Sequence, residues 1–203
     1  CPVHGLALIR RRKRQWDDQF RELASMVPER GAELDRLIDD TEELSASPMQ
    51  AYVLDRLDGA SGPEWLDGQT MEQAVRCTEM LGMRIEFGAS KKPSEMTTGE
   101  WDAAGRAGYE VTSGGEPAIR DALHQMQAEF RGARGKPGCR KIFGPFYEWL
   151  SSNKNRKDAG DITRILRDHI LNTMDVAAGQ TVLGGALDER RLHSVQSLAS
   201  ETK

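Results

Sequence analysis

The stretch TMEQAVRCTEMLGMRI, residues 70–85, defines the clearest local pattern near the middle of the chain. Thr70 and Gln73 have the spacing of a capping box, in which each side chain accepts a hydrogen bond from a free amide of the first helical turn. Apolar and small residues then recur at helical spacing, which places them on one face. These residues are Met71, Ala74, Val75, Thr78, Leu81 and Ile85. The segment predicts an amphipathic helix with a buried side.

Upstream of this segment, three further helices are expected. Trp16, Phe20, Leu23 and Val27 follow a helical repeat that Pro28 ends. A second helix is expected around residues 34–44. A third begins at Ser47-Pro48, where serine caps the helix and proline occupies its first turn, and it ends at Asp58-Gly59.

Downstream, helices are expected over residues 98–111, 117–130, 143–150 and 162–174. In the second of these, Ile119, Leu123, Met126 and Phe130 are expected in the core, with Glu129 facing water. No long stretch alternates with period two, so no sheet is expected. The sequence therefore predicts an all-α protein. We expect two helical subdomains, residues 1–90 and 91–203, with the boundary in the loop 88–93.

Composition restricts the class of protein. The formal net charge of -4 would repel phosphate backbones at long range, so nucleic-acid binding would depend on local basic patches. Cys1, Cys77 and Cys139 are an odd, scattered set, which argues against a disulfide framework and favours a reducing compartment. No apolar run approaches the length of a membrane span or a secretion signal. We expect a cytoplasmic protein without membrane contact.

Three clusters of cations are candidate nucleic-acid contacts. The alternative interpretation of each cluster is a solvated, solubilising surface. Local basic patches on an acidic protein nevertheless favour contact with phosphates. The candidates are Arg10, Arg11, Arg12, Lys13 and Arg14; Arg131, Arg134, Lys136, Arg140 and Lys141, in a loop expected over 131–141; and Lys154, Arg156 and Lys157, in a second expected loop.

The first residues, Cys1-Pro-Val-His4-Gly5, are candidate metal ligands, because a cysteine and a histidine three apart on a turn place a thiolate and an imidazole on one zinc ion. They supply only half of a tetrahedral site. Two alternatives are a frayed chain end and a cysteine nucleophile with His4 as its base. His169 is expected to pack on an apolar helix face. No catalytic constellation is complete, which argues against an enzyme.

The last residues, 192–203, have a small-residue apolar pattern like the first helix of a helix-turn-helix. The pattern stops before a recognition helix. The chain also begins without methionine, and we expect it to be part of a longer protein.

Several of these elements, in order along the chain, resemble the TniQ family of bacterial transposons. Cys1-Pro-Val-His4-Gly5 resembles an element of that family's zinc finger, and Gly144-Pro-Phe-Tyr-Glu-Trp149-Leu150 resembles its G-P-[LF]-Y-x-W-L block. The remaining matches are Tyr52 to Leu57 with Trp65-Leu66-Asp67, Glu79 to Gly82, Ala104 to Tyr109 with Gly115-Glu-Pro117, and Arg191 to Val195 with Leu198-Ala199. The chain departs from the family after Gly5, where the basic block from Arg10 replaces a second cysteine pair.

The resemblance implies a non-enzymatic targeting adaptor for DNA transposition. Such a protein binds DNA or a DNA-bound targeting complex and recruits an AAA+ ATPase regulator. Zinc is the implied metal, with Cys1 and His4 as half of its site in this chain. The alternative function is a helical protein-interaction or transcription-regulator domain unrelated to transposition, in which the basic clusters only keep the protein in solution.

Overall fold

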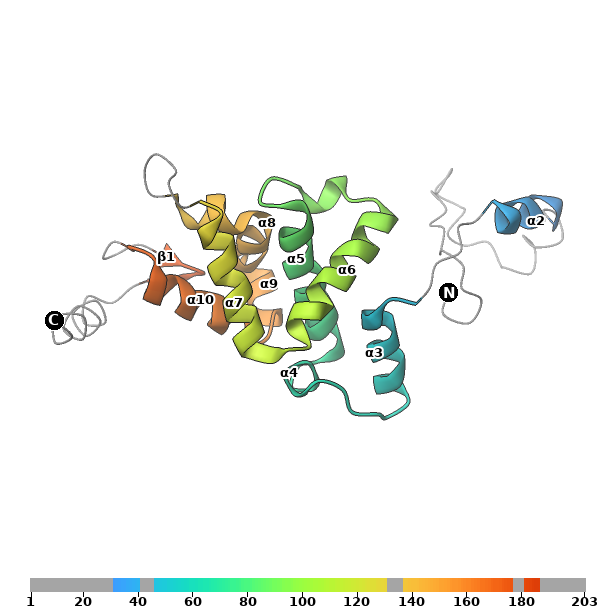
Figure 1. Cartoon of the computed structure of the whole chain (residues 1–203), viewed down its shortest axis with the longest axis horizontal. Coiled ribbons are helices and arrows are strands. Elements are labelled where there is room, and N and C mark those ends of the chain that lie inside the picture. The colour runs from blue at the N-terminus through green and yellow to red at the C-terminus, as the bar shows by residue number, and fades with distance from the viewer. Residues whose placement is uncertain (1–30, 41–45, 131–136, 177–180, 187–203) are drawn as a thin grey trace.

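The computed structural model describes residues 31–40, 46–130, 137–176 and 181–186. From α3 (Pro48–Leu57) onward these form a set of packed helices and one small hairpin (Figure 1). The predicted helical fold is confirmed. The helices are α2 (Gly31–Asp39), α3 (Pro48–Leu57), α4 (Glu64–Asp67), α5 (Met71–Phe87), α6 (Thr98–Thr112), α7 (Gly115–Ala128), α8 (Cys139–Ser151), α9 (Asn153–Asp158) and α10 (Ile162–Thr173), with a 3-10 turn at Pro93–Glu95. Within these parts of the chain, no helix combines the length and apolar character needed to cross a bilayer.

The expectation of no sheet is wrong in one detail. Strands β1 (Thr181–Val182) and β2 (Gly185–Ala186) pair in antiparallel fashion through the two-residue loop Leu183-Gly184. Both loop residues have positive φ, at 47° and 74°, as a type I′ hairpin turn requires. Strands of two residues are too short to leave an alternating pattern in the sequence.

Local signals position the helix starts. At α3, the Ser47 hydroxyl accepts from the Gln50 amide at 3.2 Å, while the Gln50 side chain accepts from the Ser47 amide at 3.1 Å. At α5, Thr70 and Gln73 make the same reciprocal pair, at 3.2 and 3.0 Å. Both predicted caps are therefore confirmed. A further capping box, Thr97 with Glu100, begins α6.

Helices α5 and α6 lie unusually close because glycines face the partner backbone. A Cβ built on Gly82 would overlap the Ala104 carbonyl, and one built on Gly108 would overlap the Thr78 carbonyl. Glycine is the residue that permits such an approach of two backbones. Between the helices, the buried hydroxyls of Thr78 and Thr112 form a hydrogen bond at 3.0 Å.

One hydrophobic core extends from α5 to the hairpin and includes residues from both sides of the loop 88–97. Met80, Leu81 and Met83 of α5 are buried with Ile119 of α7 and Phe143 of α8. The boundary expected near residue 90 therefore crosses a shared core. A smaller cluster of Met49, Tyr52, Leu66 and Ala74 attaches α3 and α4 to α5.

The predicted core face of α7 is buried at Ile119, Leu123 and Met126. Phe130 lies beyond the helix end and is only partly buried against the core. Glu129 is half exposed, as expected of a water-facing residue, but it also pairs at 2.8 Å with Arg84, which is 1% exposed. Arg84 Nε donates to the Ile142 carbonyl at 2.8 Å, so this arginine connects α5, α7 and α8.

Helix α8 is bent at Gly144, whose φ of 53° breaks the helical backbone immediately before Pro145. A Cβ at Gly144 would overlap the backbone of Ala89, which follows α5. The aromatic residues Phe143, Phe146 and Tyr147 are buried on both sides of the bend. The bend therefore lies where the backbone of α8 meets the segment that follows α5.

Candidate nucleic-acid interface

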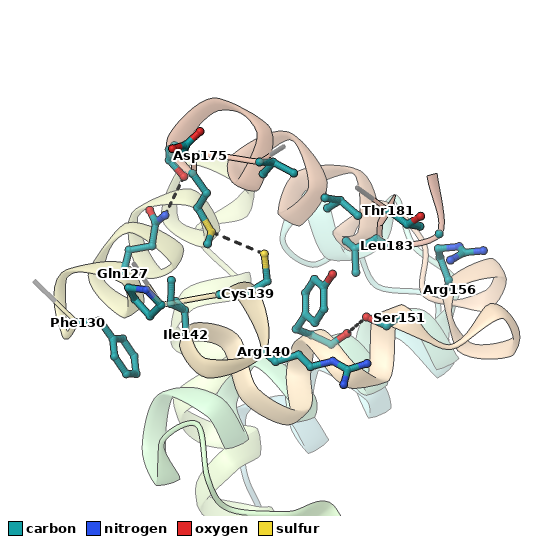
Figure 2. A pocket seen from close by; sticks show the side chains of 18 of the residues that line it. Gln127, Phe130, Cys139, Arg140, Ile142, Ser151, Arg156, Asp175, Thr181 and Leu183 are labelled. Atoms are coloured by element: carbon teal, nitrogen blue, oxygen red, sulfur yellow. Dashed lines mark hydrogen bonds between the residues drawn. The ribbon is translucent and has the colours of Figure 1, made fainter. Parts of the chain in front are cut away.

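A pocket of about 840 Å³ lies between the first turn of α8, the start of α9, the end of α10 and the hairpin (Figure 2). Its apolar walls include Ile142, Tyr147 and Leu183. Its polar lining includes two cations, Arg140 and Arg156. Helices α8 and α9 pack against each other, which fixes the positions of these two residues.

The two cations come from separate clusters that the sequence analysis identified. Arg140 lies on α8 and Arg156 on α9, and both line the same pocket. Lys141 and Lys154, their neighbours on the same two helices, are exposed. The fold therefore brings parts of two predicted basic clusters to one end of the molecule.

The loop expected over 131–141 is wrong from Cys139 onward, and the second expected loop is wrong at Lys154, Arg156 and Lys157. Arg140 and Lys141 belong to the first turn of α8, which begins after Gly138, because the buried Phe143 and Phe146 extend the helix back toward the basic segment. Lys154, Arg156 and Lys157 lie in α9 rather than in a loop. Helical backbone fixes the direction of the Arg140, Lys154 and Arg156 side chains more firmly than a loop would.

The other sequence-predicted site residues lie outside the described residues. These are the metal candidates Cys1 and His4, the basic block Arg10, Arg11, Arg12, Lys13 and Arg14, and the loop cations Arg131, Arg134 and Lys136. The helix expected over residues 16–27 and the helix-turn-helix start at 192–203 lie outside them as well.

Arg156 is held in place without being neutralised. Its Nη2 donates to Asn153 Oδ1 at 2.6 Å, and its buried Nη1 has no hydrogen-bond partner in the described part of the chain. By contrast, Arg164 Nη2 lies 2.6 Å from Glu116 Oε2, and its Nε lies 2.7 Å from Asp161 Oδ1. Hydrogen bonds from Arg164 lower the pKa of both carboxyl groups, so the α7–α10 surface is neutralised internally.

The thiols do not add reactive chemistry to the pocket. Cys139 lines the pocket, with Sγ 3.9 Å from Met174 Sδ (Figure 2). Burial raises the pKa of Cys139, and burial raises the pKa of Cys77, in the core, to about 12. Both thiols therefore stay protonated at neutral pH, whereas nucleophilic attack and metal binding need the thiolate. Within the described residues, no three His, Cys, Asp or Glu side chains are grouped to hold a metal ion.

His169 packs on the apolar face of α10, as its position in the sequence predicts, and is 2% exposed. Its Nε2 lies 2.9 Å from Gln127 Oε1, and its ring meets that of His124 edge-on, with centroids 4.6 Å apart. Burial lowers the pKa of His169 to about 4, with further contributions from His124 and Arg120. His169 is therefore neutral at physiological pH and serves packing.

Sequence reasoning missed the hairpin wall of the pocket, Thr181 to Gly184. The only available signal was Gly184-Gly185 after a short apolar pair, which by itself predicts a loop. No protein-family model, curated protein or solved structure matches the chain. The function therefore has to be inferred from the arrangement of the residues themselves.

Proposed function

We propose that the protein is a non-enzymatic adaptor that directs DNA transposition by contacting DNA and recruiting an AAA+ ATPase regulator. The observation that supports DNA contact is that Arg140 and Arg156, from two sequence clusters, line one pocket, and that Lys141 and Lys154 on the same two helices are exposed. The role in transposition and the ATPase partner rest on the resemblance to the TniQ family.

The chemistry of these cations suits contact with the phosphate backbone of DNA. Lysine and arginine side chains on a surface meet phosphates and position a protein on the duplex without reading base edges. Binding through them releases counterions, so its affinity falls steeply as salt rises. Sequence-specific readout would belong to other parts of the protein or to its partners.

The test compares two triple variants by fluorescence anisotropy with a labelled duplex at several salt concentrations. Arg140, Lys141 and Lys154 are replaced by alanine in one variant. Arg36, Arg76 and Lys92, which lie on α2, on α5 and after α5, are replaced in the other. Both variants lose three positive charges. The first variant should bind DNA more weakly than the parent. Its plot of log affinity against log salt concentration should be less steep, by about 0.9 for each phosphate that the protein no longer neutralises. The control variant should show neither change.

Equal loss of affinity in the two triple variants would contradict a localised interface, because it would reflect net charge alone. The loss in the first variant should also be the same for duplexes of unrelated sequence. Adjacent transposase and AAA+ ATPase genes, and co-elution of the protein with that ATPase, test the second half of the proposal.

The alternative, a helical protein-interaction domain, is favoured by one observation. Leu57 on α3 is 70% exposed and Leu54 is 39% exposed, so α3 presents apolar side chains to solvent. A folded parent protein that shows no salt-sensitive DNA binding would favour this alternative.

A further inference from the structure

Three buried polar atoms without partners lie on α9 and α10, and two of them belong to arginines that contact the hairpin. They are Arg156 Nη1, Thr163 Oγ1 and Arg167 Nε. In the described part of the chain, only Trp65 Nε1 shares this condition. Buried polar groups are nearly always hydrogen-bonded, and an unpaired one is costly, so such a group calls for an explanation.

Two successive glycines of the hairpin, Gly184 and Gly185, each contact one of the two arginines. A Cβ on Gly184 would overlap the guanidinium of Arg156, and a Cβ on Gly185 would overlap the guanidinium of Arg167. Each guanidinium therefore lies directly against the hairpin backbone. Thr163 lies one helical turn before Arg167, on the same side of α10.

The turn itself is held in a strained form. Leu183 has a φ of 47°, which is uncommon for a residue with a side chain, and it is 3% exposed. Burial of the Leu183 side chain offsets the strain of its backbone. The hairpin is therefore anchored in the core, and the two glycines hold a fixed position over the arginines.

The charges of Arg156 and Arg167 are not balanced within the described residues. Neither guanidinium has a carboxylate within ion-pair distance there, whereas Arg84, Arg120 and Arg164 all do. An arginine carries its charge at every physiological pH and has only donors to offer. A threonine hydroxyl supplies one more donor. A cluster of donors with two positive charges matches a ligand that is negative and only accepts hydrogen bonds.

We propose that Arg156, Thr163 and Arg167 form a binding site for one oxyanion group, tested first with inorganic phosphate, beside Gly184 and Gly185 of the hairpin. Charge-assisted hydrogen bonds from arginine to phosphate are among the strongest in proteins, and the planar guanidinium matches the geometry of the ligand. The site shares Arg156 with the proposed DNA interface, but it does not include the exposed cations Arg140, Lys141 and Lys154. It does not depend on the proposed role in transposition.

The first experiment measures thermal unfolding of the full 203-residue chain in sodium phosphate and in sodium chloride at equal ionic strength. Phosphate should raise the Tm of the parent by about 3 °C at a concentration well above its Kd, because it binds the folded state alone. Arg167→Gln should abolish this shift, while Arg76→Gln, which removes an exposed cation from α5, should retain it.

Calorimetric titration with inorganic phosphate gives the affinities. Thr163→Val preserves the shape of the side chain and removes only the hydroxyl, so it should weaken binding about fivefold without unfolding the protein. It also keeps the test decisive if Arg167→Gln fails to fold. An unchanged Tm of the folded parent in phosphate would overturn the proposal, and so would an undiminished phosphate affinity in Thr163→Val and Arg167→Gln.

Measuring DNA binding by the same variants distinguishes a free phosphate from a phosphate of the DNA backbone as the source of the oxyanion. If Arg167→Gln loses the phosphate response but keeps the parent's affinity for duplex DNA, the ligand is a free phosphate compound. If both decline together, the site accepts a phosphate of the DNA backbone. The triple variant of Arg140, Lys141 and Lys154 should keep the phosphate response, which separates this inference from the proposed interface.

Discussion

The α5–α6 pair and the region where α9, α10 and the hairpin meet both depend on glycines, but those glycines admit different groups. Gly82 and Gly108 admit the carbonyls of the opposite helix, and the hydroxyls of Thr78 and Thr112 between the helices satisfy each other. Gly184 and Gly185 instead admit two arginine side chains whose buried nitrogens are not all satisfied.

Because of this difference, we expect the α5–α6 pair to contribute to stability and the region of α9, α10 and the hairpin to contribute to binding. A region whose polar groups are paired internally gains little from any ligand, and it determines how firmly the fold holds. A region that keeps charged donors unpaired gives up some stability and retains the capacity to bind. Substitutions between α5 and α6 should therefore change the free energy of unfolding. Substitutions of the cations on α8, α9 and α10 should instead change the affinity for ligands.

The largest expected effect is that of Gly108→Ala. The new methyl group would meet the Thr78 carbonyl and force the two backbones apart, which should lower the free energy of unfolding by about 3 kcal/mol. Gly105→Ala is the matched control on α6, because nothing lies within 4 Å of its Cβ position. It should be neutral or stabilise by up to about 1 kcal/mol. Urea unfolding measures both, and equal effects would show that the close approach is unimportant.

Acid should unfold the protein next most strongly, through His169. Its pKa is about 4 in the folded chain and about 6.5 in an unfolded one, so the unfolded chain binds the proton more tightly. The stability contributed by neutral His169 is present above pH 6.5 and is lost as pH falls toward 4, by on the order of 2 kcal/mol. Plots of the free energy of unfolding against pH, from about pH 7 to 4, should be flatter for His169→Gln than for the parent. They should keep most of their slope in His124→Gln, because His124 is exposed.

The threonine pair between α5 and α6 should show a smaller effect. Thr78→Val leaves the buried hydroxyl of Thr112 without its partner and should cost about 1 to 2 kcal/mol. Replacing both threonines by valine removes both polar groups and should cost less than the sum of the single changes. A double-mutant cycle by chemical denaturation measures this coupling, and strict additivity would mean that the hydroxyls do not depend on each other.

The smallest expected effect on stability is that of Lys141→Ala with Lys154→Ala. Both side chains are exposed, so the free energy of unfolding should stay within about 0.5 kcal/mol of the parent value, as thermal unfolding can measure. The same double variant should weaken DNA binding measurably at low salt. A large loss of stability would place these lysines with the structural region and remove them from the proposed interface.

Local sequence signals predicted much of the helical frame. The caps at Ser47 and Thr70 depend on side chains three residues apart, and such contacts are visible in the sequence. The helix expected over 98–111 is present at Thr98–Thr112. The buried face of α7 follows from its helical repeat up to Met126.

The candidate sites were less predictable, because they depend on contacts between distant residues. Arg156 meets a glycine turn 28 positions later, counted from Arg156 to Gly184, and nothing local to either residue indicates the contact. Lys154, Arg156 and Lys157 have the composition of a loop, yet they form α9. The pairing of Glu129 with Arg84, across 45 residues, likewise required the fold.

The bend at Gly144 bears on the order in which the molecule is assembled. Its backbone lies against Ala89, at the point where the chain leaves α5 and turns toward α6. During synthesis, α5 and α6 emerge first and can meet while α8 is still inside the ribosome. Gly144 can then pack against Ala89, in the segment that connects these two helices. The close α5–α6 contact in the described part of the chain is thus local in sequence, and all of its residues are synthesised before α8.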